Sequence, residues 1–320
     1  MSAPARIAVV IPCFKVKASI LDVIATIPTL VEKIIVVDDA CPQESGKHVQ
    51  ASCADSRVEV LFNAVNCGVG GAVIRGYQRA LELGYDIIVK LDGDAQMDGA
   101  LIPFFVKPIE QGHADYSKGN RFYHPRSLQN MPPLRLVSNA LLSFMTKLSS
   151  GYWNSFDPTN GYTAISAAAL KRLPLDRISQ RYFFESDMLF RLNTIQAVAM
   201  DIPIDAVYAE EISNLKFCAN IAPFLIGNLR NTIKRIVYNY YLRNFSLASL
   251  QLLIGLPLML FGLSYGVYHW VESAQTHQVA SAGTVMVAAL PIIVGFQLLL
   301  SFLNYDINSV PRYPISRSLR

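Results

Sequence analysis

Charged residues are scarce in this chain, at 16% of 320 residues, and they are missing altogether from two long stretches. No aspartate, glutamate, lysine or arginine occurs from Phe245 to Val271, nor from Val279 to Tyr305. Each stretch is longer than the roughly 20 apolar residues that a helix needs to cross a bilayer. Two buried core helices are the alternative, but such helices rarely run so far without a charge. We therefore expect a membrane-spanning hairpin over residues 245–305.

Basic residues are absent between the two stretches, at residues 272–278, and frequent outside them. Those outside are Arg230, Lys234, Arg235 and Arg243 on one side and Arg312, Arg317 and Arg320 on the other. Segments rich in lysine and arginine stay on the cytoplasmic side of a membrane. We expect a protein of the inner (plasma) membrane with two spans and both termini in the cytoplasm, including a tail over 306–320. The apolar run at 7–14 is too short for a signal peptide.

Several common functional signatures are also missing. The five cysteines show neither paired spacing nor a histidine cluster, which argues against a disulfide framework or a zinc site. No Gly-Lys-Ser/Thr occurs for a P-loop, and no Gly-x-Ser-x-Gly occurs for a serine hydrolase. The net charge of +4 is modest and comes partly from the membrane flanks, so we expect no nucleic-acid partner.

Short apolar runs alternate with helical stretches before the membrane segments. The runs at 6–11, 33–37, 58–62 and 87–91 are expected strands with helices between them. This alternation indicates βαβ units and therefore a mostly parallel sheet. Further helices are expected near 134–150 and 184–194, a short strand from residue 161, and an edge strand at 198–204. A helix near 19–29 should begin with Ser19 as its N-cap.

Two carboxylates follow the expected strand at 87–91. Asp92 and Asp94 flank Gly93, at the carboxyl end of the strand, where open α/β sheets bind their ligands. Two carboxylates so spaced can approach a divalent cation that phosphate oxygens also hold. A solvated turn is the alternative, because Asp-x-Asp arises by chance about once in a chain of this length.

Two further features follow the neighbouring strands. Asp38 and Asp39 end the second strand, where they can accept hydrogen bonds from a base or ribose or cap a turn. The glycine turn at 66–71 follows the third strand and lets backbone come close to a ligand. It does not fit the dinucleotide-binding fingerprint, which follows the first strand. Three such features on consecutive strand ends favour a nucleotide-sugar site.

Residues 217–244 differ from the segments on either side. Leu225, Leu229 and Ile233 recur at helical spacing, and the basic residues fall off that stripe. An amphipathic helix of this kind lies in the headgroup layer of a membrane. An ordinary surface helix is the alternative.

The order of five segments, at 9–12, 36–39, 66–72, 91–96 and 119–122, resembles the motif series of glycosyltransferase family 2. The subgroup it resembles is the polyprenyl-phosphate glycosyltransferases, of the dolichol-phosphate mannose and glucose synthase type, with two C-terminal transmembrane helices. The resemblance implies an α/β fold with a GT-A-type, Rossmann-like cytosolic domain over 1–216. Amphipathic interface helices over 217–244 and the hairpin over 245–305 would follow, and the protein would form a homo-oligomer, a tetramer.

The resemblance also implies roles for single residues. Asp92, Asp94 and Gln96 would surround Mg²⁺ or Mn²⁺ and the donor diphosphate, and the residues that bind the donor nucleotide would be Pro12, Asp39, Gly68 and Asp92. The lipid phosphate would be held by Arg121, Arg135 and Ser138, although a surface ion pair is the alternative for the two arginines. Residues 157–162 resemble the acceptor-side loop and 185–187 the acidic motif on the following helix, which adds Asp157 and Asp187 to Asp94, Arg121 and Arg135 as candidate catalytic residues.

The chain departs from the family pattern in two places that bear on the substrate. The Asn-Glu pair expected after Pro12 is replaced by Lys15 and Val16, which leaves the donor open between UDP and GDP sugars. The Gln-x-x-Arg-Trp motif of processive polysaccharide synthases is absent.

The function expected from the resemblance is inverting transfer of a hexose to polyprenyl or dolichyl phosphate at the cytoplasmic membrane face. The donor would be UDP-glucose or a similar nucleotide sugar, with GDP-mannose possible, and the product would serve cell-envelope glycan modification. A phosphate monoester is largely a dianion at neutral pH and needs little help from a base. Transfer to a hydroxyl of a glycan or glycolipid is the alternative, and it would need Asp157 or Asp187 as base. A second alternative is a degenerate domain that serves as a non-enzymatic scaffold.

Overall fold

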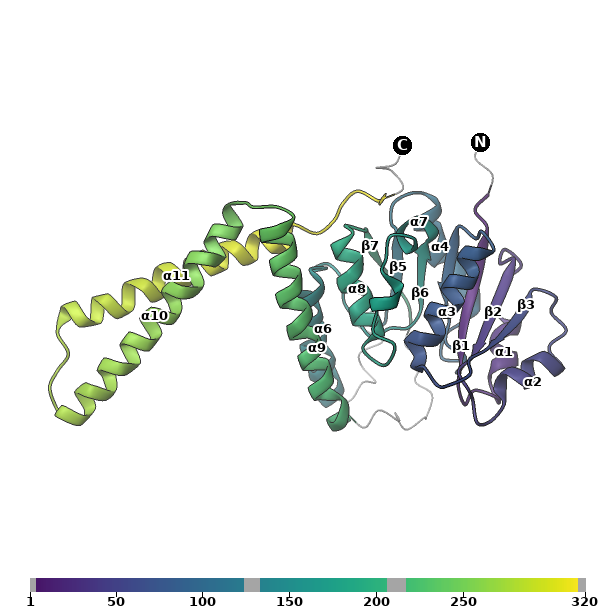
Figure 1. Cartoon of the computed structure of the whole chain (residues 1–320), viewed down its shortest axis with the longest axis horizontal. Helices are drawn as coiled ribbons and strands as arrows, with labels where there is room; N and C mark the ends of the chain where they lie inside the picture. Colours follow the sequence, from purple (N-terminus) through teal and green to yellow (C-terminus); the bar gives the residue numbers. More distant parts are fainter. Residues whose placement is uncertain (1–3, 124–132, 206–216, 316–320) are drawn as a thin grey trace. The chain divides into compact units, whose positions relative to one another are not determined.

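The computed structural model describes residues 4–123, 133–205 and 217–315, with backbone alone for 133–135 and 217–221. The chain divides into two compact units (Figure 1). The first comprises Met1–Ile233 together with Pro311–Arg320, and the second comprises Lys234–Val310.

Within the described residues, the first unit is built on one sheet of seven strands in the order β3-β2-β1-β4-β6-β5-β7. In chain order the strands are Ile7–Cys13, Lys33–Asp38, Val58–Phe62, Ile87–Lys90, Tyr116–Asn120, Thr163–Ser166 and Ala199–Pro203. All neighbouring pairs are parallel except those of β6, which runs antiparallel to both β4 and β5. The predicted mostly parallel sheet is confirmed.

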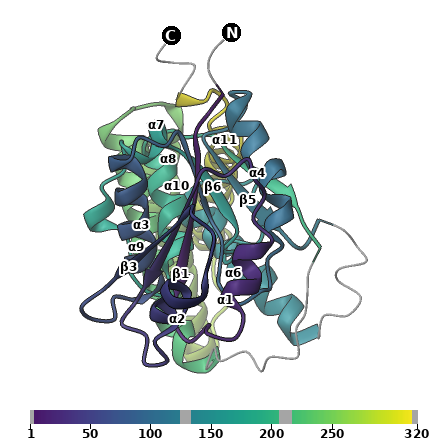
Figure 2. The same cartoon turned by 90° about the vertical axis from the view of Figure 1, so that its right-hand side faces the viewer.

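Helices cover both faces of the sheet, which explains why its central strands are mostly apolar, with Lys90 at the end of β4 as an exception. Alternate residues of β1, such as Val9 and Ile11, pack with α1 (Ile20–Ala25) and α4 (Ile102–Glu110) in one core. Val10 points to the other face, where Gly76 lets α3 (Gly68–Glu82) come close. Figure 2 shows α3 and α4 on opposite sides of the strands.

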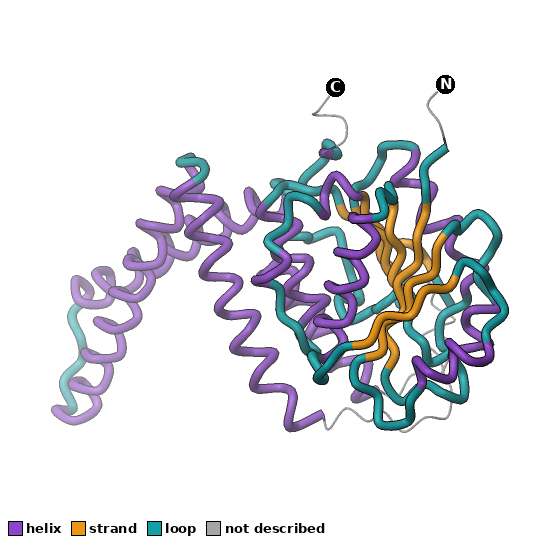
Figure 3. The backbone as a smooth tube through the Cα atoms, turned by 45° about the vertical axis from the view of Figure 1, so that its right-hand side comes forward, coloured by secondary structure: helices purple, strands orange, loops and turns teal. Residues whose placement is uncertain are grey.

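The remaining helices of the first unit lie beside the sheet or join its strands. They are α2 (Ser45–Ser52), α6 (Pro133–Ser150), α7 (Ala167–Leu170), α8 (Phe184–Thr194) and most of α9 (Phe217–Val237), with short 3-10 turns at Gly99–Leu101 and Leu175–Arg177. Figure 3 shows the strands together at the centre of this unit, with helices around them. Ser19 precedes α1, but its hydroxyl does not cap that helix and instead donates to the carbonyl oxygen of Gly93 at 2.7 Å.

Helix α9 (Phe217–Val237) is amphipathic, but it buries polar residues and exposes apolar ones, the reverse of a usual surface helix. Its polar residues Asn228 and Asn231 are buried, and its apolar residues Leu225, Leu229 and Ile233 are exposed. Asn231 donates to Asp187 Oδ1 of α8 at 2.9 Å, and the Asn228 side-chain oxygen accepts from the Ser149 hydroxyl of α6 at 2.6 Å. The helix is therefore attached to the sheet domain by its polar side, and its apolar side is left outward.

The second unit is a pair of long apolar helices, α10 (Leu247–Thr276) and α11 (Ala282–Asn308), preceded by a π-helical turn at Tyr238–Leu242. Both are long and apolar enough to span a membrane. They approach closely at glycines: a Cβ on Gly262 would lie 2.7 Å from the Ala288 carbonyl oxygen, and one on Gly295 would lie 2.7 Å from Met259 N. Small residues commonly bring membrane helices together in this way.

One buried ion pair fixes the base of this hairpin. Arg235 binds Asp306 through two nitrogens, at 2.6 and 2.9 Å, and the Tyr240 hydroxyl donates to the same carboxylate at 2.6 Å. All three side chains are buried. The end of α11 is thus tied to the segment that precedes α10.

After α11 the chain returns to the first unit. The backbone N–H of Ile315 contacts both carboxylate oxygens of Asp115 at 3.0 Å, and Asp115 Oδ2 also accepts from the Val198 N–H at 2.9 Å. Asp115 and Ile315 are both buried. The segment after the hairpin is therefore packed on the sheet domain, beside the start of β5.

Candidate active site

The loop after β4 carries the predicted metal-binding residues. Asp94 and Gln96 are exposed, while the side chain of Asp92 is only 28% exposed. Asp94 Oδ1 accepts the Gln96 N–H at 3.1 Å, and Ala95 between them has a φ of +61°. The bond from Ser19 to Gly93 fastens this loop to the start of α1. The structure thus brings the three predicted residues into one tight turn at the carboxyl end of β4.

These residues fit only one kind of cation site. Among the described residues, no group of three or more histidine, cysteine, aspartate or glutamate side chains converges to hold a metal ion. Magnesium at nucleotide sites usually takes only one or two carboxylates, because substrate phosphates and water supply the other ligands. Asp92 and Asp94 fit that kind of site, in which the metal binds together with a diphosphate. They do not fit a cage made by protein alone, and their role as ligands stays a prediction.

A buried lysine lies behind Asp92 and was missed by the sequence reasoning. Lys90 Nζ lies 2.8 Å from Asp92 Oδ1 and 3.3 Å from Glu185 Oε1, and it donates to the Gly161 carbonyl oxygen at 3.1 Å. Burial opposes its charge, but the two carboxylates outweigh burial and raise the pKa of Lys90. Burial, reinforced by the charge of Asp92, raises the pKa of Glu185. The available signal was a lysine inside an otherwise apolar strand.

Asp39 is the residue predicted to lie beside the nucleotide base. Its carboxylate is buried and accepts three hydrogen bonds: from Asn63 Nδ2 at 2.7 Å, from the Cys67 N–H at 2.9 Å and from the Gly68 N–H at 2.8 Å. Asp39 therefore fixes the start of α3 in this structure. Its neighbour Asp38 binds the N–H groups of Cys41 and Gly46, at 2.8 and 2.6 Å, and so has a turn-capping role.

The glycine turn at the start of α3 permits a close approach of protein backbone. Gly68 has a φ of +84°, and a Cβ there would lie 2.6 Å from the Gln180 carbonyl oxygen. A Cβ on Gly70 would lie equally close to the Ser179 carbonyl oxygen. The segment before α8 thus fills the space beside these glycines. Pro12, at the end of β1, pairs with Val37 of β2, and contacts of Pro12 and Gly68 with a nucleotide remain predictions.

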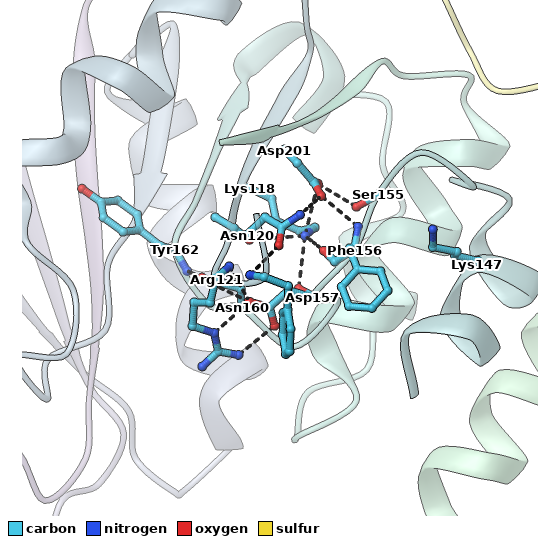
Figure 4. A network of polar contacts seen from close by, with 12 residues as sticks. Lys118, Asn120, Arg121, Lys147, Ser155, Phe156, Asp157, Asn160, Tyr162 and Asp201 are labelled. Atoms are coloured by element: carbon cyan, nitrogen blue, oxygen red, sulfur yellow. Dashed lines mark hydrogen bonds and ion pairs between the residues drawn. The ribbon is translucent and has the colours of Figure 1, made fainter. Parts of the chain in front are cut away.

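Arg121 and Asp157 form the centre of the predicted acceptor side. The guanidinium binds the carboxylate through Nε and Nη2, each at 2.7 Å, and the Arg121 N–H adds a third bond at 3.2 Å (Figure 4). Asp157 is buried, whereas the Arg121 side chain is 28% exposed. Burial opposes ionisation of Asp157, but Arg121 outweighs it and holds the pKa of this carboxyl below its usual range. Asp157 thus orients Arg121 and is a poor proton acceptor.

The loop that carries Asp157 is fixed by a second buried lysine. Lys118 Nζ lies 3.2 Å from Asp201 Oδ1 and donates to the carbonyl oxygens of Phe156 and Asp157. Asp201 also accepts from the Ser155 hydroxyl and the Phe156 N–H, each at 2.8 Å. Figure 4 shows these groups gathered beside the Arg121 pair. Asp157 has a φ of +55°, and this network holds it in that unfavourable conformation. The sequence reasoning did not find Lys118 or Asp201.

Asp187 serves as an anchor in this structure. Its buried carboxylate accepts from the Ser179 N–H at 2.9 Å, Arg191 Nε at 3.0 Å and Asn231 Nδ2 at 2.9 Å. All three partners are structural, so Asp187 links α8 to α9. On α6, Ser138 is half-buried, while the side chain of Arg135 lies outside the residues described. The predicted joint role of Arg121, Arg135 and Ser138 stays a prediction.

Comparison with known proteins shows to which family this chain belongs. The model of the family described as "Glycosyl transferase family 2" matches residues 8–173, just over half of the chain. The UDP-N-acetylglucosamine–dolichyl-phosphate N-acetylglucosaminyltransferase of Methanococcus voltae is 35% identical over 154 residues, 48% of this chain and 61% of that protein. The undecaprenyl-phosphate mannosyltransferase of Micrococcus luteus is 32% identical over 179 residues, 55% of this chain and 72% of that protein. The chain thus spans about three fifths of the first relative's length.

Among solved structures, glucosyl-3-phosphoglycerate synthase from Mycobacterium tuberculosis in complex with UDP has a TM-score of 0.55 at 22% identity. The alignment covers 72% of this chain and 80% of that one. The same enzyme with Mn²⁺, UDP and glucosyl-3-phosphoglycerate has a TM-score of 0.54. At this identity the likeness concerns the fold alone, and it confirms the expected GT-A-type architecture.

Proposed function

Because the chain belongs to glycosyltransferase family 2, we propose that it transfers a hexose from a nucleotide sugar to polyprenyl or dolichyl phosphate. The relatives from Methanococcus voltae and Micrococcus luteus are named for sugar transfer to such lipid phosphates. We place the reaction at the cytoplasmic face of the inner (plasma) membrane. The donor is a UDP or GDP sugar, with UDP-glucose as the first candidate.

The outward apolar face of α9 is the observation that best supports the proposal of a lipid acceptor. The helix is joined to the sheet domain through Asn228 and Asn231, and it exposes Leu225, Leu229 and Ile233. Apolar residues would not be left outward along a whole helix face in water, but they are stable against lipid. Helix α6 adds exposed apolar residues of the same domain, namely Val137, Leu141 and Phe144. A domain that lies on a bilayer in this way can receive an acceptor whose chain stays in the lipid.

The donor would bind at the carboxyl ends of β1, β2 and β4. Asp39 would lie by the base, and Asp92, Asp94 and Gln96 would hold Mg²⁺ or Mn²⁺ with the diphosphate. The metal would supply positive charge for the departing nucleoside diphosphate. An oxygen of the acceptor phosphate attacks the anomeric carbon from the opposite side, and the bond from that carbon to the diphosphate breaks with inversion.

The state of the candidate bases supports a phosphate acceptor. Transfer to a hydroxyl needs a carboxylate that can take up its proton. Asp157 is engaged by Arg121, and Asp187 is engaged by three donors. A phosphate monoester needs no such base, because it is largely a dianion above its second pKa near 6. Arg121, with Arg135 and Ser138, would position that phosphate.

The proposed topology has two spans, with the catalytic domain over 1–216 and both termini in the cytoplasm. The contact of Ile315 with Asp115 supports it, because a segment after the hairpin that packs on the sheet domain has to lie on the same side of the membrane. Residues 217–244 would form the interfacial segment and 306–320 the tail. We also propose a homo-oligomer, a tetramer, by resemblance to the family.

Transfer assays on the purified protein in lipid vesicles test the proposal. Radiolabelled UDP and GDP sugars are supplied in turn with Mg²⁺ or Mn²⁺, and the vesicles contain either polyprenyl phosphate or the matching polyprenol. We expect a labelled lipid only with polyprenyl phosphate. Equal labelling of polyprenol would favour the hydroxyl-acceptor alternative, and the absence of Mn²⁺-dependent nucleotide binding would favour a scaffold.

A further inference from the structure

Lys90 is the last residue of β4 and lies two positions before Asp92. Side chains two positions apart in an extended chain project to the same face, and this spacing puts both on the side covered by α3 and α8. Lys90 is fully buried, and its ammonium contacts Asp92, Glu185 and the carbonyl oxygen of Gly161. A charged chain Glu185–Lys90–Asp92 thus runs from inside the domain to the predicted metal loop.

We propose that Lys90 is a positioning residue, which orients the Asp92 carboxylate toward the metal and diphosphate, and that Glu185 in turn holds Lys90. This inference rests on the proposed function and assigns a residue to its donor side. It also gives Glu185 a role there, although the motif that contains Glu185 resembles an acceptor-side element.

The geometry at Asp92 supports this role. The oxygen that Lys90 contacts, Oδ1, has almost no solvent exposure, yet the Asp92 side chain is 28% exposed. Lys90 Nζ therefore pairs with the buried oxygen of Asp92, and the exposed area of the Asp92 side chain comes from its other atoms. The close fit continues at Gly161, where a Cβ would lie 2.2 Å from Asp92 Oδ2 and 2.6 Å from Lys90 Nζ. A larger residue at position 161 would therefore require the side chains of this ion pair to move.

A purely structural role for Lys90 is a poor explanation. Buried ion pairs are costly to desolvate and often add nothing to stability compared with apolar residues of similar size. An apolar residue at position 90 would match the buried residues Ile87, Ile88 and Val89 of the same strand. Groups behind a metal ligand, in contrast, commonly change metal affinity by about 10–100-fold.

The test separates positioning from folding. Lys90→Met alone would leave Glu185, whose side chain is only 13% exposed, and Asp92 without their cation, and the protein can fail to fold. The double variant Lys90→Met/Glu185→Gln removes both charges and should melt close to the wild type. Mn²⁺ binding in the presence of UDP is then measured by electron paramagnetic resonance on the full-length protein in detergent or nanodiscs.

We expect the double variant to bind Mn²⁺ with UDP at least about tenfold more weakly than the wild type. Glu185→Gln alone keeps the pair of Lys90 with Asp92 and should lose less than about threefold, and Lys90→Arg should retain part of the affinity because it keeps the charge. Lys33→Met/Glu59→Gln serves as the control, because it removes a partly exposed lysine–carboxylate pair, at 3.1 Å, away from the site; Glu59 also pairs with Arg79 at 2.8 Å.

Two outcomes would overturn the proposal, and they can be told apart. If the wild type binds Mn²⁺ with UDP and the folded double variant binds it equally well, Lys90 does not position Asp92. If the wild type itself shows Mn²⁺-dependent binding of neither UDP nor GDP, the proposed function fails together with this inference.

Discussion

The guanidinium of Arg121 and the carboxylate of Asp157 form a two-point ion pair, with both N–O distances at 2.7 Å and the carboxylate buried. The residue proposed to hold the acceptor and the residue considered as a base are therefore one unit. Their pairing favours a phosphate acceptor over a hydroxyl acceptor, because Asp157 cannot serve as a free base while it orients Arg121.

Loss of Arg121 should impair use of the acceptor. We expect Arg121→Gln to raise the KM for polyprenyl phosphate roughly tenfold or more, because a hydrogen bond to a charged group contributes about 1.5–3 kcal/mol. Arg121→Lys should recover only part, because it keeps the charge and loses the fork. The KM for the nucleotide sugar should change little. Steady-state transfer with each substrate varied separately measures this, and a loss confined to the donor would contradict the assignment.

The same variant needs a control for folding, since Arg121→Gln leaves Asp157 buried without its partner. The double variant Arg121→Gln/Asp157→Asn removes both charges and should regain melting temperature but not acceptor affinity. Recovery of both would reduce Arg121 to a structural residue.

Asp94→Asn should reduce transfer by at least about a hundredfold while the protein stays folded. Loss of a metal ligand removes charge stabilisation of the leaving diphosphate, and each 1.36 kcal/mol of barrier is about tenfold in rate. Asp94 is exposed, and an asparagine keeps a side-chain oxygen that can accept the Gln96 N–H, so the fold should be retained. Transfer is measured at saturating Mg²⁺ beside Asp98→Asn, a control on the same loop whose side chain caps a 3-10 turn. Near wild-type activity of Asp94→Asn would refute the metal assignment.

Transfer should fall below about pH 6 in a protein that is still folded. The acceptor phosphate takes up a proton near pH 6 and loses nucleophilicity. Asp157 behaves differently: its folded pKa is held below its unfolded value of about 3.9, so its contribution to stability persists above that pH and is lost only as the pH falls through the folded value. Rate and melting temperature are measured over the same pH series, and a rate loss that coincides with unfolding would contradict the proposal.

The hairpin between the two apolar helices should be outside the cell. Gln275→Cys, in a background without reactive native cysteines, should react with an impermeant thiol reagent added to intact cells. Tyr313→Cys lies in the tail at a residue that is 81% exposed and should react only after permeabilisation. The opposite pattern would reverse the proposed orientation.

The sequence predicted the features that depend on short spacing. Strand positions followed from apolar runs, Asp92 and Asp94 from their place after a strand, and the two long helices from missing charge. The pairing of Lys90 with Glu185, 95 residues away, was missed, and so was that of Lys118 with Asp201, which is also remote in sequence. Such pairs form only when strands and helices have been placed, and spacing alone does not reveal them. The engagement of Asp157 by Arg121 and that of Asp187 by Asn231 escaped prediction for the same reason.

The attachment of Ile315 to Asp115 sets an order of events during synthesis. Asp115 lies directly before β5, which is next to the edge strand β7, and the N–H it binds is translated 200 residues later, after both apolar helices. In the proposed topology, both apolar helices are therefore synthesised and inserted into the membrane before this contact can form. If only one helix crossed, residue 315 would be carried to the opposite side and Asp115 would lose that donor. In that topology, the contact between Ile315 and Asp115 forms only in chains in which both apolar helices have crossed the membrane.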